Sequence, residues 1–419
     1  MKKRFFYSIL ILLTMAACTT DDAPDITQIE TATLLTIEME GNYLATNDAF
    51  YYLIQDTGGT IIPSGFGSLT NGQTIAIEGD AALNGLNISL FKFISNQNRI
   101  EAVSYLEVPI AKTLTLKAPP AISSSSSVEV QFENTPDQLD EFVFSANNRF
   151  TPGSLSILPA ANTSFGIGNY GQLETTFTSI EDVTSSVPSY QIFTPTDANV
   201  NTVDFANNIP MENSHSISND LEGATIRTKL VGYRDNNFES PEGNHVLYNT
   251  YTPSTTQGAF TIYSLNNFFS DYQLTIYGNT NEAEFIQITN GAIPSNFKGQ
   301  DTSLSIDQDA FANYQISAAE TNTATSTYWT LKGTDGISDV LRWTVYAYND
   351  QSAFISLSDL PTSLTNDFPE LANMEQMNLE YARSIVIPTA SFNTAIDTIF
   401  SGGRLSLSTF VYYKTIYTQ

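Results

Sequence analysis

The chain has 419 residues, a formal net charge of −27 and a single cysteine. A chain this acidic is repelled by nucleic acid and by anionic lipid, so neither is an expected partner. One cysteine cannot form a disulfide within the chain, and stability therefore has to come from hydrophobic cores. The length predicts about two to four domains.

The first segment of the chain has the pattern of an export signal. Basic residues at 2–4 precede an apolar run over 5–13, and the small residues Ala16 and Ala17 lead directly into Cys18. An apolar run of this length is too short to cross a bilayer as a helix. A basic start, a short apolar stretch and small residues in this order are typical of a cleaved signal peptide.

This start resembles a bacterial lipoprotein signal, in which residues 1–17 are removed and Cys18 is lipidated. The acidic residues that follow, Asp21, Asp22 and Asp25, resemble the surface-export tag of Bacteroidota lipoproteins. The resemblance implies a fatty-acid anchor such as palmitate, in the outer membrane and facing the cell exterior. Residues 18–30 would then form a flexible acidic tether. The alternative is a plain secretory signal followed by an unrelated cysteine.

The sequence changes at Thr31 to short runs of β-branched and aromatic residues. Turn residues such as Asn71-Gly72 and Asn84-Gly85 separate these runs. Strands at this spacing are typical of β-sandwiches, so we predict an all-β protein of tandem, immunoglobulin-like β-sandwich domains. The predicted organisation is a sandwich over 31–117, a Pro/Ser linker over 118–127, a β-rich domain over 128–251, a second linker over 252–258 and a β-rich domain over 259–419.

One segment has helical character. In residues 367–382, Asp367 can cap a helix and Pro369 suits its first turn. Leu371, Met374 and Tyr381 would then fall near one face. The alternative for this segment is strand and loop.

The chain is poor in residues for nucleophilic or metal chemistry. It contains two histidines, His215 and His245, which we interpret as loop or surface residues, and it has no GxSxG motif. A serine hydrolase needs a histidine beside its serine, and a zinc site needs more ligands than one histidine pair supplies. We therefore expect a protein that is not an enzyme. A glycoside hydrolase built on two carboxylates stays an alternative, because the sequence selects no pair of acids.

Two acidic clusters have the oxygen ligands that calcium prefers. Asp307 and Asp309 form one, and Asp335 with Asp339 forms the other. Neither completes an EF-hand pattern, so the sequence leaves calcium open and predicts no other cofactor.

The most informative stretch covers 326–348, which reads as two strands joined by a Gly-Thr-Asp-Gly loop. If Leu331 and Leu341 are cross-strand neighbours, Trp329 lies opposite Trp343. Strand side chains alternate between faces, so both indoles should be buried on one face.

The opposite face carries Tyr328, Arg342, Tyr346 and Tyr348. Sugar rings have apolar C–H faces that lie on aromatic rings, and arginine can donate hydrogen bonds to their hydroxyls. These four residues are the predicted ligand-binding platform. The alternative is that these tyrosines only cover the surface and bind no ligand.

In its anchor, length and domain order, the chain resembles the outer-membrane starch-binding lipoproteins of Bacteroidota. This resemblance implies a non-enzymatic surface protein that binds extracellular glycan and works with outer-membrane transport or adhesion proteins; it transfers no site residue. The alternative is a structural subunit resembling the fimbrillin pilins, which accept a donated strand after an N-terminal segment is removed. No arginine lies between Cys18 and Arg99, so a trypsin-like cut early in the first domain has no support.

Overall fold

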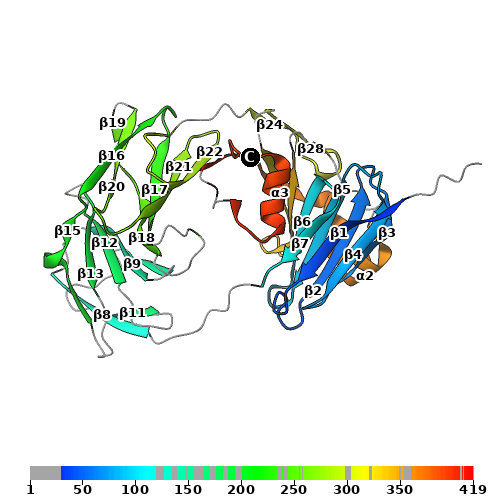
Figure 1. The fold of residues 1–419 in the computed structure, drawn as a ribbon, viewed down its shortest axis with the longest axis horizontal. Helices are drawn as coiled ribbons and strands as arrows, with labels where there is room; N and C mark the ends of the chain where they lie inside the picture. Colours follow the sequence, from blue (N-terminus) through cyan, green and yellow to red (C-terminus); the bar gives the residue numbers. More distant parts are fainter. Residues whose placement is uncertain are drawn as a thin grey trace, which may run out of the picture.

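The structure is a computed structural model (Figure 1). The residues that it describes are 30–118, 127–134, 139–146, 149–153, 164–168, 176–182, 187–193, 201–234, 238, 244–253, 255–256, 258–297, 303–319, 323–348, 351–352, 360–405, 408 and 410–418. The predicted signal peptide, Cys18 and all of the tether except Glu30 lie outside these residues.

A twelve-stranded sheet runs through the whole molecule. In Figure 1 it links the blue strands of the N-terminal region to the green strands on the other side. Its strands, in spatial order, are β18 (Asn244–Tyr251), β17 (Thr225–Tyr233), β21 (Asp271–Asn279), β22 (Glu284–Gly291), β30 (Phe410–Tyr417), β29 (Asn378–Val386), β26 (Ala324–Lys332), β27 (Asp339–Ala347), β6 (Arg99–Val108), β5 (Leu86–Ile94), β2 (Ala49–Asp56) and β3 (Ile61–Ser68).

A three-stranded sheet packs on the N-terminal end of the large sheet and forms a β-sandwich with it. Alternate residues of the smaller sheet, such as Leu35 and Ile77, face alternate residues of the larger one, such as Ile54 and Ile88, in one buried core. The short helix η1 (Ser95–Gln97) joins β5 to β6. The strands of the smaller sheet are β4 (Thr74–Asp80), β1 (Thr31–Met39) and β7 (Lys112–Leu116).

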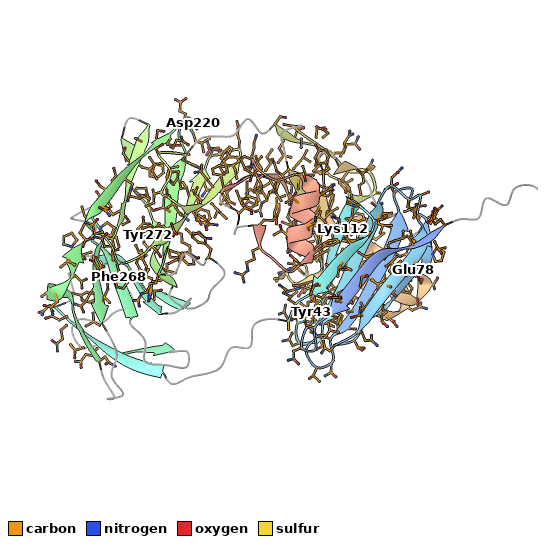
Figure 2. The ribbon with its side chains drawn as sticks, viewed as in Figure 1. Tyr43, Glu78, Lys112, Asp220, Phe268 and Tyr272 are labelled. Carbon is orange, nitrogen blue, oxygen red and sulfur yellow. The ribbon has the colours of Figure 1, made fainter. Side chains whose placement is uncertain are left out.

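A second sandwich forms at the other end of the large sheet, where Figure 2 labels Phe268 and Tyr272. Ile217 and Phe260 from the covering sheet pack against Leu274 of the large sheet. The strands of this covering sheet are β19 (Thr255–Thr256), β20 (Ala259–Ser264), β16 (Asn213–Asn219) and β23 (Asn296–Phe297).

Three further sheets complete the described part of the fold. Val143 of β9 packs with Val246 of β18, so one of these sheets rests against the end of the large one. The first is β10 (Arg149–Gly153), β9 (Leu139–Ala146), β12 (Thr176–Asp182), β13 (Ser189–Phe193) and β15 (Ile209–Pro210). The second is β11 (Ser164–Gly168), β8 (Ser127–Glu133) and β14 (Asn201–Asp204), which η3 (Phe205–Asn207) follows, and the third is β24 (Leu304–Gln308), β25 (Gln315–Ala318) and β28 (Gln351–Ser352).

Short helices cover both faces of the large sheet near its centre. The helices η4 (Phe311–Asn313), α2 (Thr362–Asp367) and η6 (Pro369–Gln376) bury their apolar residues on one face. The helix α3 (Phe392–Phe400) packs on the opposite face through residues such as Ala395 and Ile396. The backbone N–H of Thr394 donates to the side chain of Ser391, which caps α3.

The predicted all-β class with β-sandwich packing is confirmed, and strand pairs join segments that the sequence assigns to separate domains. Most of the predicted linker 118–127 lies outside the described residues. β6, from the predicted first domain, pairs in parallel with β27, from the predicted third. β16 pairs with β20 across the predicted linker 252–258, and β19 lies inside that linker. Turn and strand patterns are local, whereas the choice of partner strand is not, so segments that look separate in sequence share one sheet.

The helix predicted over 367–382 is also only partly present. Pro369 does open a helical segment, the 3₁₀ helix η6, in which Leu371 and Met374 are buried as expected. From Asn378 onward the chain is instead strand β29. Tyr381 therefore lies on the large sheet and not on a helix.

Candidate functional site

The register predicted for the β26–β27 hairpin is confirmed. Leu331 pairs with Leu341, and Trp329 pairs with Trp343. Both indoles are 0 % exposed. Their N–H groups are satisfied, because Trp343 Nε1 donates to Ser104 Oγ at 2.9 Å and Trp329 Nε1 donates to a threonine hydroxyl. This face of the hairpin is core.

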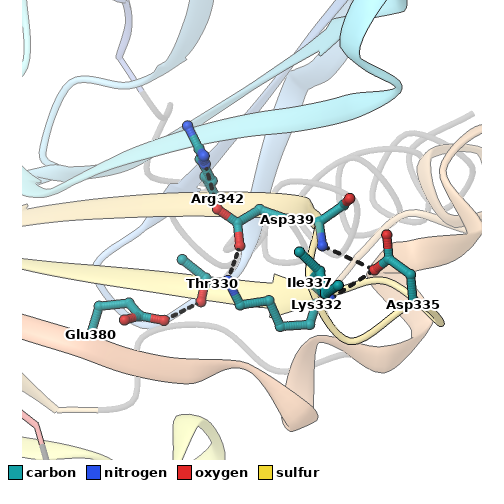
Figure 3. A network of polar contacts seen from close by, with 8 residues as sticks. Thr330, Lys332, Asp335, Ile337, Asp339, Arg342 and Glu380 are labelled. Atoms are coloured by element: carbon teal, nitrogen blue, oxygen red, sulfur yellow. Dashed lines mark hydrogen bonds and ion pairs between the residues drawn. The ribbon is translucent and has the colours of Figure 1, made fainter.

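A network of polar contacts holds the turn end of the hairpin (Figure 3). Asp339 lies between Lys332 and Arg342, with N–O distances of 2.5 and 2.8 Å. Asp335 accepts the backbone N–H groups of Ile337 and Ser338, both at 2.9 Å. The Ser338 side chain, together with these two backbone bonds, holds the pKa of the Asp335 carboxyl at about 2. The carboxylates of this loop are therefore occupied in shaping the turn.

The two acidic clusters considered for calcium are both engaged in contacts of this kind. Asp307 accepts hydrogen bonds from the hydroxyls of Ser305 and Ser317, which lower its carboxyl pKa. Among the described residues, no group of three or more His, Cys, Asp or Glu side chains is placed to hold a metal ion.

Three tyrosines form a row across neighbouring strands on the face opposite the tryptophans. Tyr328 of β26 pairs with Tyr381 of β29, and Tyr381 pairs with Tyr417 of β30. Directly paired residues point to the same side of a sheet. The Tyr328 and Tyr381 rings are stacked with centroids 5.2 Å apart, and Tyr417 meets Tyr381 edge-on at 6.0 Å. We call these three residues the tyrosine row.

Arg383 lies beside this row, two residues further along β29. Its guanidinium is 4.9 Å from the ring centroid of Tyr381 and 5.6 Å from that of Tyr413. Arg383 Nε donates to Thr415 Oγ1 at 2.9 Å. Burial raises the pKa of Tyr413 to about 12, against the opposing effect of the Arg383 charge. The guanidinium is thus within cation–π distance of two aromatic rings.

The tyrosine row lies where the cover over this face of the sheet ends. Phe400 of α3 packs edge-on against Tyr105, and Ile385 is buried in the same core. Four residues before Ile385 on β29, Tyr381 is only half-buried, and Tyr417 is 51 % exposed. The same face is therefore core at one end of β29 and accessible to solvent at the other.

The structure brings together three of the four predicted platform residues. Tyr328 belongs to the tyrosine row. Arg342 lies near it, since its positive charge opposes the rise in the pKa of Tyr328 that burial causes. Tyr346 is half-buried and close enough to Arg383 for that charge to act on its pKa. Tyr346 is not an open surface, however, because its ring stacks on Tyr105 at 5.5 Å.

Tyr348 lies apart from the row. It is 47 % exposed, and its ring centroid is 6.0 Å from that of Phe392 at the start of α3. Together with Glu107 and Asn393 it lines a small hollow of about 320 Å³. The single predicted platform is therefore divided between two places.

The two histidines are placed differently from what the sequence suggested. His215 lies within β16 and is half-buried, and His245 lies within β18 and is 1 % exposed. His245 Nδ1 donates to the Ser145 carbonyl oxygen at 3.2 Å. Burial lowers the pKa of His245 to about 4. The interpretation as loop or surface residues is therefore wrong for His245, whereas His215 lies in a strand with part of its side chain exposed.

Two other hollows lie on the described surface. One, of about 800 Å³, is lined by polar loops at Asp220, Glu222 and Asn281 together with Lys414. Lys414 alternates along β30 with Thr415, so this hollow is on the other face of the sheet from the tyrosine row. The second, of about 570 Å³, lies between the edge strands β3 and β4.

Comparisons with known proteins add little to this geometry. No protein-family model matches the chain, and no curated protein matches it. One solved structure similar to part of it holds the N-terminal four Ig domains of Dscam1 isoform 8.4, at 7 % identity and a TM-score of 0.13. The match covers 76 % of this chain and 97 % of that one, and a score this low supports no conclusion. Within the described residues, no helix is both long and apolar enough to span a membrane.

Proposed function

We propose that this protein is a lipid-anchored cell-surface protein that binds extracellular glycan through the tyrosine row. The observation that carries the proposal is the alignment of Tyr328, Tyr381 and Tyr417 across three adjacent strands, on a face left partly open to solvent. Such a row presents the edges and hydroxyls of the stacked Tyr328 and Tyr381 rings, and the exposed ring of Tyr417, at fixed spacing on a rigid sheet. A glycan can lie along it with one C–H face against Tyr417 and its hydroxyls beside those of the row.

Polar groups at the edge of the row supply hydrogen bonds to the same ligand. Arg383 donates through its planar guanidinium, and Arg342 lies on the other side of Tyr328. The tyrosine hydroxyls both donate and accept. Aromatic surface flanked by a few fixed polar groups is the usual composition of a small-ligand site.

The lipid anchor rests on Cys18 alone. A Cys18→Ser change removes the only thiol that a lipid could modify. We expect metabolic labelling with a fatty-acid probe to mark the wild-type protein and not the variant. Equal labelling of both would contradict the anchor, and glycan binding by the purified protein would be unaffected by that result.

For the pilin alternative, the relevant feature is the hollow between β3 and β4, where a donated strand could pair only with a sheet edge. A donated strand needs a continuous row of free backbone groups at a sheet edge. In β3, Pro63 has no N–H to give and Ser64 adopts a φ of 60°, so the edge is interrupted. These features oppose strand addition at this edge.

A glycan-array screen of the purified full-length protein in detergent tests the proposal. We expect binding to a defined set of glycans, and at least a tenfold loss of that binding in the Tyr381→Ala, Tyr417→Ala double variant. Tyr263→Ala removes a half-buried tyrosine of β20 and serves as the matched control. Undiminished binding by the double variant would assign the ligand to another surface.

A further inference from the structure

We infer that the ligand of the tyrosine row is an anionic sugar, whose carboxylate or sulfate group is bound by Arg383. This inference rests on the proposed glycan-binding function and adds the chemical class of the ligand. It follows from three features of Arg383: its position, its fixed orientation and the absence of a counter-ion.

Arg383 is positioned at the centre of the partly open face. It pairs with Ser326 of β26 on one side and with Thr415 of β30 on the other, two residues along each strand from the tyrosine row. A sugar that lies over the row at Tyr381 is therefore beside the guanidinium. A substituent at that edge is the group that the arginine meets.

The guanidinium is held in place before any ligand arrives. Its Nε donates to the Thr415 hydroxyl, and the rings of Tyr381 and Tyr413 lie within cation–π distance of it. Its two Nη groups have no hydrogen-bond partner among the described residues. These groups form a planar fork of N–H donors, the geometry that matches two oxygens of a carboxylate or sulfate.

Arg383 also has no carboxylate partner within the described part of the chain, and this distinguishes it from the other arginines of the same face. Arg342 is paired with Asp339 at 2.8 Å, and Arg99 is paired with Glu101 at 2.7 Å. The protein has a net charge of −27, yet no described carboxylate forms an ion pair with Arg383. A half-buried, uncompensated guanidinium is the part of this surface that gains most from an anion.

The acidity of the whole chain does not prevent such binding. Charges beyond about 8 Å are largely screened at physiological ionic strength. The anion therefore interacts mainly with Arg383 and its immediate neighbours Tyr381, Tyr413 and Thr415, which are neutral. A carboxylate on this face, Glu284 of β22, lies one strand beyond Thr415 and acts on Tyr417. A neutral glycan, in contrast, would leave the guanidinium facing hydroxyls alone.

Two matched pairs of polysaccharides test the inference on the full-length protein in detergent, at about 150 mM salt. The pairs are polygalacturonate with its methyl ester, and dextran sulfate with dextran. We expect at least one anionic probe to bind tenfold or more tightly than its neutral counterpart. Preference within the first pair identifies a carboxylate as the bound group, and preference within the second identifies a sulfate.

Three variants assign this preference to Arg383. Arg383→Gln should abolish it, and Arg383→Lys should retain part of it because lysine keeps the charge without the planar fork. Arg404→Gln removes the same charge from an exposed position in the loop before β30 and should leave the preference intact. Near-ultraviolet circular dichroism verifies that each variant is folded.

Other results separate this inference from the proposed function. Equal binding of the neutral and anionic probes would overturn the inference and leave glycan binding standing. A preference that survives Arg383→Gln would place the anion elsewhere and also overturn it. If the protein binds none of the four probes but does bind neutral glycans on the array, the inference is also overturned. If it binds no glycan in either assay, the proposed function is overturned as well.

Discussion

The two faces of the sheet at strands β26, β27 and β29 differ in how deeply their side chains are buried. On one face Trp329 and Trp343 are fully enclosed beneath η4, α2 and η6. On the other, Tyr328 and Tyr381 stack side by side and are only half-buried. Because strand residues alternate between faces, the same three strands supply a core on one side and a partly open aromatic surface on the other. The core and the proposed ligand surface are thus separated by a single residue step along each strand.

The largest effect that we predict concerns the buried face. Trp329→Ala or Trp343→Ala should lower the free energy of unfolding by about 3–5 kcal/mol, because each leaves a cavity where a fully enclosed ring packed. Tyr417→Ala, on the open face, should change it by no more than about 0.5 kcal/mol. Urea denaturation measures both. A tryptophan variant as stable as the tyrosine variant would remove the contrast between the faces.

The next effect concerns a buried polar group at the end of the same sheet. The pKa of His245 is lowered to about 4 by burial, whereas an exposed histidine titrates near 6.5. Between these two pH values, the unfolded chain therefore binds a proton at His245 that the folded chain does not bind. Stability should be fully present above about pH 6.5 and fall by about 3 kcal/mol as the pH drops to about 4.

Comparison with a variant isolates this contribution from that of the carboxylates. His245→Phe cannot take up a proton, so its unfolding free energy should vary less with pH in this window than that of the wild type. The Ser145 carbonyl that accepts from His245 loses its donor in the variant, which lowers stability at every pH. Identical slopes for the two proteins between pH 6.5 and 4 would show that His245 titrates normally.

A smaller effect distinguishes two predicted platform tyrosines, Tyr346 within β27 and Tyr348 just after its end. Tyr346 stacks on Tyr105 and packs against the core, whereas Tyr348 is half exposed beside Phe392. Tyr346→Ala should cost about 1–2 kcal/mol, since a stacked pair contributes beyond its buried area. Tyr348→Ala should cost about 0.5 kcal/mol or less. Equal costs, measured by thermal unfolding, would mean that the cover by α3 does not reach Tyr346.

The hairpin shows what local sequence can predict. The alternation of apolar and polar residues around one short loop was enough to pair Trp329 with Trp343 and to bury both. Register within a hairpin depends on the turn and on which side chains need burial, and both are visible in a stretch of some twenty residues.

The tyrosine row shows what local sequence cannot predict. Pro369 and Leu371 begin a helical segment, and their pattern predicts that it continues to Tyr381. The helix instead ends before Asn378, where the chain pairs as strand β29. Tyr328 and Tyr381 are neighbours because β26 pairs with β29, and Ala102 meets Trp343 because β6 pairs with β27. Such pairings join segments tens to hundreds of residues apart, and no turn between them records the choice.

The most direct test of the account is chemical footprinting of the tyrosines with and without glycan. Nitration of the full-length protein, followed by mass spectrometry, reports how accessible each ring is, and the strongest glycan from the array serves as ligand. The account predicts that bound glycan protects Tyr381 and Tyr417 while Tyr348 reacts to the same extent as before. Protection of Tyr348 with no change at Tyr381 and Tyr417 would contradict it.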